Sequence, residues 1–312
     1  KTIASSNFLN VARISFNRTN PDLDNAAQPD DDALAFVPGR MWNISFTVTG
    51  GQDASIGNLG HQNAAPSIFT QNIWEFSDAV DYHTGAHSLR MGFNLQRQQN
   101  NNFVYSSQSR YTFGDVTNFL RGNPNRFEAQ TLNSDPVQGL RQWMTAMYVQ
   151  DDLKVSNNLN LNLGLRYEFV SIPTEVHNGQ ATIVDILHDT AVTKGPGWLE
   201  NPSLKNFAPR FGFAWTPFGS TKTSVRGGFG IFYDRISQNA ITALNSNPPW
   251  NENANIFDGN IDTPGGGTRR AFPLNVTMWP RDLRNPRVTS YNIGIQQQLP
   301  RQVILEVNYV GN

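Results

Sequence analysis

Cysteine is absent from the 312 residues of this chain, and charge of either sign is scarce. Without cysteine the chain forms no disulfide, no thiolate metal site and no cysteine nucleophile. Charged residues make up 16% of the sequence and the net charge is −1, so no basic field exists that would attract nucleic acid. Nucleic acid is therefore not expected as a partner.

Long apolar runs are also missing. No window approaches the ~18 uninterrupted apolar residues of a membrane-spanning helix, and mean hydropathy is −0.45. Low hydropathy is compatible with membrane-spanning strands, because only every second residue of such a strand meets lipid. An apolar signal region is absent too, since the chain opens with Lys1-Thr2-Ile3-Ala4. We therefore expect a fragment of a longer chain, whose length suits one large sheet as well as two domains.

Strict alternation of apolar and polar residues is the main signal that the sequence does contain. In the 11 residues 159–169, Leu, Tyr and Phe occupy every second position, with Asn, Gly, Arg and Glu between them. Such a segment has one apolar and one polar face and matches the ~9–11 residues of a tilted transmembrane strand. The same alternation recurs at 89–96, 207–215, 225–234, 291–295 and 303–309.

Connections of two very different lengths separate these segments. A soluble sandwich has turn signals every ~8–12 residues, whereas an outer-membrane barrel alternates short periplasmic turns with long extracellular loops. The pattern therefore predicts an all-β, antiparallel, up-and-down transmembrane barrel. The short connections are Thr84–Ala86, Ser156–Asn158, Phe218–Thr221 and Leu299–Arg301, and the long ones run about 105–139, 173–204 and 236–286.

Strand direction must alternate across a membrane, and this condition tests the assignment. The strand before the Thr84 turn covers about 70–83, so residues 20–68 form one extracellular excursion. The run Trp42–Val48 inside it is predicted to be a rim strand and not a full crossing. Nine crossing strands result, the first near residues 7–18 and the last near 302–311. Because bacterial single-chain barrels have even strand numbers, the barrel is expected to be partial.

Several segments share particular residues beside each turn as well as the alternation. They are YVQDDLKV at 148–155, LNLNLGLRYE at 159–168, NFAPRFGFAW at 206–215, VRGGFGIFYD at 225–234, QQQLP at 296–300 and LEVNYVG at 305–311. Together they resemble the barrel of TonB-dependent receptors, in particular the Oar-like group that carries a carboxypeptidase-regulatory-like N-terminal domain.

The resemblance implies a 22-stranded barrel plugged by an N-terminal domain with a TonB box ahead of it. Residues 1–312 would then be a partial barrel domain without the plug and the box. It also implies a Gram-negative outer-membrane protein, surrounded by outer-membrane lipid, that takes up a scarce ligand. Siderophore, oligosaccharide and peptide all fit as ligands. The implied partners are the TonB–ExbB–ExbD complex, acting through the N-terminal region, and a surface lipoprotein.

Two other functions remain open at this point. The resemblance to Oar-like proteins does not imply a single substrate class. The barrel could therefore serve adhesion instead of uptake, as a membrane anchor for extracellular loops. A soluble two-sheet carbohydrate-binding module would also show alternating strands.

Charged residues on the polar side of the predicted strands are the candidates for a lumen site. They could line a substrate path or contact a plug, but a wet lumen also tolerates charge, and neighbouring strands pair opposite signs. These candidates are Arg90, Arg166, Glu168, Arg210, Arg226, Asp234 and Glu306.

Tryptophans divide between strands and loops. Trp74, Trp143 and Trp215, with the strand tyrosines, suit the aromatic girdles of a membrane protein, although core packing would also use them. Trp198 could join the girdle as well. Trp198 and Trp250 fall in predicted outer loops and are the candidates for extracellular ligand contact.

Metal and catalytic chemistry has little support. An acidic loop lacks the order of an EF-hand, with Ala27 where the sharp-turn glycine belongs, so a solvated loop is the better interpretation. The five histidines lack zinc-ligand spacing, and Gly227–Gly230 lies in a strand without a following helix. No Ser/His/Asp arrangement has nucleophile-elbow context. We expect no enzyme activity, metal or cofactor. The acidic loop contains Asp22, Asp24, Asp30, Asp31 and Asp32.

Overall fold

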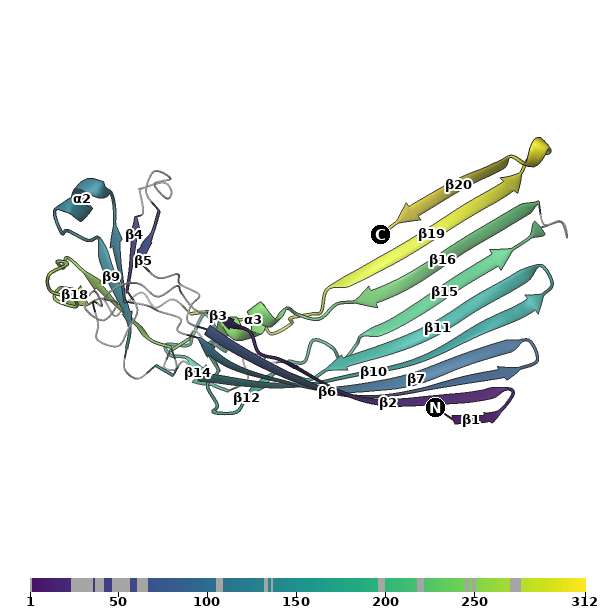
Figure 1. Cartoon of the computed structure of the whole chain (residues 1–312), viewed down its shortest axis with the longest axis horizontal. Coiled ribbons are helices and arrows are strands. Elements are labelled where there is room, and N and C mark those ends of the chain that lie inside the picture. The colour runs from purple at the N-terminus through teal and green to yellow at the C-terminus, as the bar shows by residue number, and fades with distance from the viewer. Residues whose placement is uncertain are drawn as a thin grey trace.

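Strands make up most of the computed structural model, which forms an elongated molecule with a large sheet at one end and a smaller one at the other (Figure 1). The described helices are α2 (Val116–Leu120), α3 (Gln238–Ala243) and the 3₁₀ turn η3 (Pro300–Gln302). None of these described helices has the length and apolar character needed to cross a membrane. The structure describes residues 2–23, 36, 42–46, 57–60, 67–104, 109–131, 134–135, 137–195, 200–217, 222–244, 247–248, 251–269 and 276–312.

The large sheet is an antiparallel meander in which each strand pairs with the next one along its path. In order, its strands are β1 (Thr2–Ser5), β2 (Phe8–Thr19), β6 (Ser67–Thr84), β7 (His87–Val104), β10 (Val137–Ser156), β11 (Leu159–Val170), β15 (Phe207–Trp215), β16 (Thr223–Tyr233), β19 (Arg287–Gln298) and β20 (Ile304–Gly311). The nine predicted strands, β2 onward, are confirmed. Alternation missed β1 because it has only four residues.

Two very short strands add to the large sheet, and a separate pair lies in a long connection. The strand β3 (Asp22–Leu23) pairs with β6, and β12 (Thr174–Glu175) pairs with β10. The strands β13 (Ala181–Thr182) and β14 (Thr193–Lys194) pair with each other.

The two faces of the large sheet differ as the alternation predicts. In β11, Leu163 and Leu165 are on one face and half exposed, as are Phe211 and Trp215 in β15 beside it. Directly opposed residues on neighbouring strands share a face, so the apolar side chains form one continuous surface. Tyr148 departs from the expected girdle, because it is opposite Gly92 on the polar face.

Short turns close one end of the sheet. Gly85 adopts a positive φ of 55° between β6 and β7, and Arg301 adopts a φ of 62° before β20. The predicted turn at Ser156–Asn158 is confirmed between β10 and β11. The predicted turn Phe218–Thr221 lies outside the described part of the chain. A further tight turn, Ser6–Asn7, joins β1 to β2.

Three strands extend well past the length needed to cross a membrane. β6 and β7 each have 18 residues and β10 has 20, against the ~9–11 of a tilted crossing. Their extra length lies at the end with the long connections. There the side chains of Gln98, Asn100 and Asn102 are polar and buried. The extensions therefore form a polar layer beyond the apolar belt.

Long connections build a second, six-stranded sheet. Its order is β18 (Thr268–Arg269), β17 (Asn253–Phe257), β9 (Arg126–Gln130), β8 (Ser109–Phe113), β4 (Trp42–Phe46) and β5 (Leu59–Gly60). We call this the loop sheet. The predicted rim strand lies here as β4, which is confirmed not to cross, and its Thr47 and Val48 lie outside the described residues.

Aromatic side chains form the core of the loop sheet. Phe46, Tyr111, Phe113 and Phe127 are each less than 5% exposed. The Tyr111 and Phe127 ring centroids are 4.6 Å apart, and the Tyr111 hydroxyl donates to the Asn260 carbonyl at 3.1 Å. Burial, with a smaller contribution from nearby Asp262, raises the pKa of Tyr111 to about 12. The long connections are thus a folded layer with its own core.

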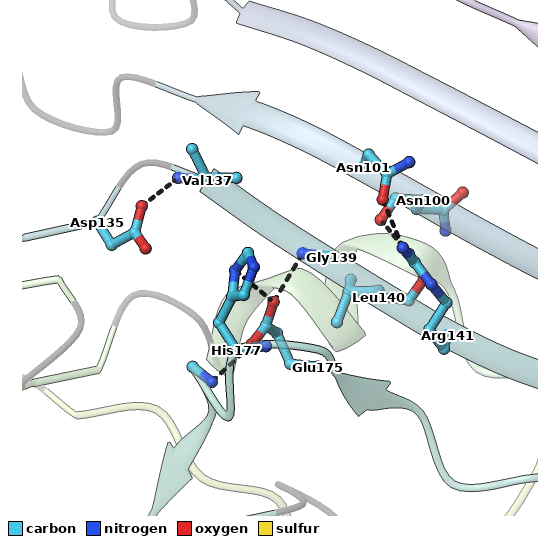
Figure 2. Close-up of polar contacts among 10 residues, drawn as sticks. Asn100, Asn101, Asp135, Val137, Gly139, Leu140, Arg141, Glu175 and His177 are labelled. Carbon is cyan, nitrogen blue, oxygen red and sulfur yellow. Dashed lines mark hydrogen bonds and ion pairs between the residues drawn. The ribbon is translucent and has the colours of Figure 1, made fainter.

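Glu175 fixes the short strand β12 to β10 (Figure 2). Its side chain is only 2% exposed, and its carboxylate accepts backbone N–H bonds from Gly139, His177 and Gly179, each at 2.7 Å. Three donors satisfy a buried charge that would otherwise be costly. The connection after β11 therefore begins from a fixed point.

Candidate functional site

The strand register places the predicted charged residues on one face of the large sheet. Arg90 is opposite Gln150, Gln150 is opposite Gly164, and Gly164 is opposite Arg210. Directly opposed residues point to the same side, so Arg90 and Arg210 share the polar face. The parity of their strands puts the other predicted strand residues on this face: Arg166, Glu168, Arg226 and Glu306.

Two of these arginines are paired with carboxylates. The Arg90 Nε donates to Asp81 Oδ1 at 2.6 Å across β6 and β7, and Arg166 donates to Glu168 on its own strand. The Arg90 side chain is 61% exposed, so solvent screens its ion pair. In both ion pairs the charge of the arginine is balanced by its carboxylate partner, so neither arginine is a strong candidate for binding an anionic ligand.

Arg226 and Glu306 lie together in a shallow pocket on the polar face. The pocket has a volume of about 320 Å³ and lies across β16, β19 and β20. Its depth depends on Gly294, because a Cβ there would lie 2.1 Å from Asn308 Oδ1. The Asn308 amide donates to Glu306 at 2.9 Å, and Arg226 has no ion-pair partner among the described residues. We call this the wall pocket.

The wall of strands divides at the end with the long connections. β15 and β16 pair only as far as Arg210 opposite Gly230. Beyond that point β15 continues to Phe207 beside β11, whereas β16 continues to Tyr233 beside β19. Figure 1 shows β15 and β16 separating toward that end. Arg210 lies at the point of divergence, with its guanidinium over the Phe232 ring at 4.7 Å.

A larger cavity lies beyond this division and has a volume of about 890 Å³. One side is formed by the connection that leads into β15. The other side is formed by the connection that leads into β19, together with the last residue of β16. We call this cavity the mouth cleft. Its lining residues are Glu200, Asn201, Pro202, Leu204, Lys205, Asn206, Tyr233, Asp282, Leu283, Arg284, Asn285 and Arg287.

Positive charge exceeds negative charge in the mouth cleft. Lys205, Arg284 and Arg287 contribute cations, against the carboxylates of Glu200 and Asp282. The Glu200 carboxylate is already 3.4 Å from the guanidinium of Arg281, which is not among the lining residues. The cleft therefore favours a ligand with an anionic group.

Asn206 adds a donor without an acceptor to the same cleft. The residue is only 3% exposed, and its Nδ2 has no hydrogen-bond partner within the described structure. A buried amide nitrogen left unpaired costs about 1–3 kcal/mol. An acceptor oxygen of a bound ligand would satisfy it.

The other predicted candidates do not join the mouth cleft. Asp234 follows the last residue of β16, and its Oδ1 accepts the Arg235 backbone N–H at 2.8 Å. Trp198 and Trp250 lie outside the described residues, as do Asp24, Asp30, Asp31 and Asp32. No cluster of three or more potential metal ligands occurs in the part of the chain that the structure describes.

The mouth cleft was not predicted, although two signals were present. Residues 281–287 lead into the first residue of a strand and contain four charged residues, a local density of charge unusual for this chain: Arg281, Asp282, Arg284 and Arg287. Asn201 and Asn206 enclose a Pro-Ser-Leu-Lys turn just before another strand. Only the separation of β15 from β16 brings the two segments to one cavity.

The protein-family model for the outer membrane beta barrel domain matches residues 1–312 of this chain. The chain belongs to this family. The large sheet is therefore the wall of an outer-membrane β-barrel, whose polar face is the lumen side and whose apolar face meets lipid. The barrel lies in the outer membrane of a Gram-negative bacterium, with its short turns on the periplasmic side.

Solved structures of outer-membrane proteins are similar to this barrel domain. They include the outer membrane transporter YddB from Escherichia coli (14% identity, 98% of this chain and 38% of that one, TM-score 0.49). FpvA of Pseudomonas aeruginosa, bound to a heterologous pyoverdine–iron complex, has 11% identity over 99% of this chain and 31% of its own, with TM-score 0.44. The alcaligin receptor FauA from Bordetella pertussis has 9% identity over 78% and 28%, with TM-score 0.34.

The barrel domain spans less than two fifths of each of these structures. No curated protein matches it.

Proposed function

We propose that this barrel takes part in TonB-dependent uptake of a scarce ligand that carries anionic oxygen atoms. The mouth cleft is the observation that carries the proposal. It combines a net positive lining with the buried, unpaired amide of Asn206, and it lies at the outer end of the wall. A captured ligand would exchange water for these fixed donors.

The polar face offers a path inward from the mouth cleft. Arg210 lies at the inner end of the division between β15 and β16. Farther toward the periplasm on the same face, the wall pocket contains Arg226, which forms no ion pair among the described residues although Glu306 lines the same pocket. Cationic groups at successive depths suit the passage of an anion through a wet lumen. The TonB–ExbB–ExbD complex would supply energy through a region outside this chain, and a surface lipoprotein would deliver the ligand.

Uptake by whole cells tests the proposal. The probes are a ⁵⁵Fe-loaded siderophore, a fluorescent maltoheptaose bearing a carboxylate and a labelled acidic hexapeptide. Cells with the gene should accumulate at least one probe, and a protonophore should abolish the accumulation. The double variant N206L/R284Q should reduce uptake at least about ten-fold, because the cleft loses a donor and a cation.

The matched control is Arg301→Gln, which removes an arginine from a periplasmic turn far from the cleft. It should leave uptake unchanged. If no probe enters above the level of cells that lack the gene, the uptake proposal fails. If uptake occurs but N206L/R284Q matches the parent, the cleft is not the capture site.

The loop sheet favours one alternative, a surface protein whose barrel anchors an adhesive layer. Its six strands enclose an aromatic core, and such a folded platform exceeds what a simple connection requires. Replacing residues 109–130, which contain β8 and β9, with a Gly/Ser linker separates the two functions. Loss of cell–cell contact with unchanged uptake would favour adhesion, and the converse would favour transport.

A further inference from the structure

Arginine side chains lie among the aromatic residues on the lipid-facing side of the barrel, near its extracellular end. Arg18 on β2 is opposite Asn72, Asn72 is opposite Gln99, and Gln99 is opposite Arg141 on β10. These four residues form one row across four neighbouring strands. Every member of the row faces away from the lumen. Side chains alternate between the two faces along a strand, and these four residues occupy the positions between the lumen-side residues.

The next row toward the periplasm contains a third arginine between large aromatic rings. Arg97 on β7 is opposite Trp74 on one side and Trp143 on the other, and Trp74 is opposite Phe16. Trp74, Trp143 and Phe16 are each about half exposed (51%, 45% and 49%). Exposed tryptophan rings on the outer face of a barrel mark the level of the membrane–water interface.

The hydrogen-bond and ring partners of the three arginines carry no charge. Arg97 lies over the Trp143 ring at 4.8 Å, and Arg18 donates to the amide oxygen of Asn72 at 3.4 Å. Arg141 donates to the amide oxygen of Asn101 at 2.8 Å, as Figure 2 shows. These partners are neutral, and among the described residues no carboxylate forms an ion pair with any of the three.

Asp78 and Asp22 are acidic groups on this face, and both lie away from the arginines. Asp78 is two rows closer to the periplasm than Trp74, and its carboxylate accepts from the Asn10 amide at 2.6 Å. Asp22 lies farther outward, beyond the end of β2. Glu175 is opposite Leu140, on the other face, and is close enough to interact electrostatically with Arg141, but it is buried and its carboxylate accepts three backbone N–H groups. The patch therefore needs its counter-charge from outside the protein.

We infer that Arg18, Arg97 and Arg141 bind the phosphorylated head group of a lipid in the outer leaflet. Guanidinium groups match phosphate oxygens with paired N–H donors, and at an interface the pair is only partly exposed to water. The acyl chains would lie along Phe16, Trp74 and Trp143 and the apolar surface below them. With strands about 4.8 Å apart, Arg18 and Arg141 lie about 14 Å apart across the wall. That span favours a head group with more than one phosphate.

Native mass spectrometry of the protein in detergent tests this inference. The probes are diphosphoryl lipid A, monophosphoryl lipid A and fully dephosphorylated lipid A. The diphosphoryl form should bind most tightly and the dephosphorylated form most weakly. Each arginine near an anionic head group contributes about five-fold in affinity, so R18Q/R97Q/R141Q should bind diphosphoryl lipid A roughly a hundred-fold more weakly.

Arg13→Gln is the matched control, because Arg13 is on β2 but on the lumen face, opposite Ser77. It should bind all three lipids as the parent does. Equal binding of the diphosphoryl and dephosphorylated forms by the unmutated protein would overturn the inference without any variant. Parent-like binding by the triple variant would overturn it as well. Full displacement of the lipid by an equal concentration of inorganic pyrophosphate would show that a lipid is not the occupant.

Discussion

The guanidinium of Arg210 lies over the ring of Phe232, with Cζ 4.7 Å from the ring centroid. Arg210 belongs to the last pair between β15 and β16, and Phe232 lies two residues beyond that pair on β16. The contact therefore joins the two halves of the wall at the inner end of the mouth cleft. A cation–π contact of this kind is worth about 0.5–1 kcal/mol at an exposed site.

This contact predicts a measurable coupling between the two side chains. Arg210→Gln and Phe232→Leu should each lower the free energy of unfolding, and the double variant should lose less than the sum. We expect a coupling of about 0.5–1 kcal/mol in a double-mutant cycle, measured by urea unfolding in lipid vesicles. Strictly additive effects would mean that the contact does not hold the two strands together.

Gly92 makes the barrel wall sensitive to a single methyl group. The Tyr148 ring lies over it, and a Cβ at position 92 would lie 2.6 Å from Cε1 of that ring. We expect Gly92→Ala to lower the free energy of unfolding by about 1–3 kcal/mol, because the ring must move.

Gly164 offers the matched control for Gly92. It lies on the same face, and a Cβ there would make only ordinary contact, with the nearest atom at 3.6 Å. Gly164→Ala should be neutral or slightly stabilising. In a Tyr148→Ala background, Gly92→Ala should become nearly harmless. Persistence of the full cost in that background would show that the ring is not its cause.

Glu175 predicts local loosening without loss of the barrel. Glu175→Ala leaves the N–H groups of Gly139, His177 and Gly179 without their acceptor. The cost is up to about 1–3 kcal/mol for each of the two partly buried donors, Gly139 and Gly179, and less for His177, which is exposed. Hydrogen exchange at these amides should accelerate at least about ten-fold.

Glu175→Gln gives the graded comparison, because its single amide oxygen replaces only part of the carboxylate. Exchange at the three amides should be intermediate, whereas exchange in the β15–β16 pair should not change in either variant. Unchanged exchange at all three amides in Glu175→Ala would contradict the role assigned to the carboxylate.

Tyr111 predicts an alkaline limit to the stability of the loop sheet. Its pKa is about 12 in the folded state, because burial disfavours the phenolate, and about 10 in an unfolded chain. Because the pKa is higher in the folded state, the contribution of neutral Tyr111 to the free energy of unfolding is complete below pH ~10 and falls as the pH rises toward 12. Absorbance at 295 nm should therefore show a late tyrosine ionisation, coupled to loss of the near-UV circular dichroism of the aromatic core.

Tyr111→Phe should remove that late step from the titration and leave the ionisation of the other tyrosines in place. It should also weaken the loop sheet modestly at neutral pH, because the Asn260 carbonyl loses its donor. A late ionisation that persists in Tyr111→Phe would assign it to another tyrosine.

Alternation, together with the positions of the short turns and the alternating direction of the strands, was enough to predict the membrane-crossing part of this fold. Residues 159–169 have clean alternation because lipid lies on one side and water on the other, and they form β11. The signal ends within β7, where Arg97, Gln99 and Asn101 on one face are as polar as Gln98 and Asn100 on the other. The strand continues because β6 and β10 continue beside it and supply backbone partners.

The loop sheet and the mouth cleft depend on information that local patterns do not contain. β9 and β17 have five residues each and pair although all the strands from β10 to β16 lie between them in the sequence. Five residues can alternate by chance, and nothing local identifies the partner. The cleft depends on where β15 stops following β16, which is decided by neighbouring strands. By contrast, the parity of each strand placed Arg90, Arg210 and Arg226 on one face without any knowledge of pairing.

The pairing of Asn253 with Gln130 has a consequence for how the protein reaches its membrane. The loop sheet is complete only when β17 arrives, and β17 follows β16 along the chain. Until then Tyr111, Phe113 and Phe127 belong to segments whose shared core is unfinished. Short aromatic β segments in that condition associate readily with other chains. This chain therefore most needs protection from aggregation while it passes through the periplasm. The reason is the aromatic side chains of the loop sheet, whose core is still incomplete at that stage.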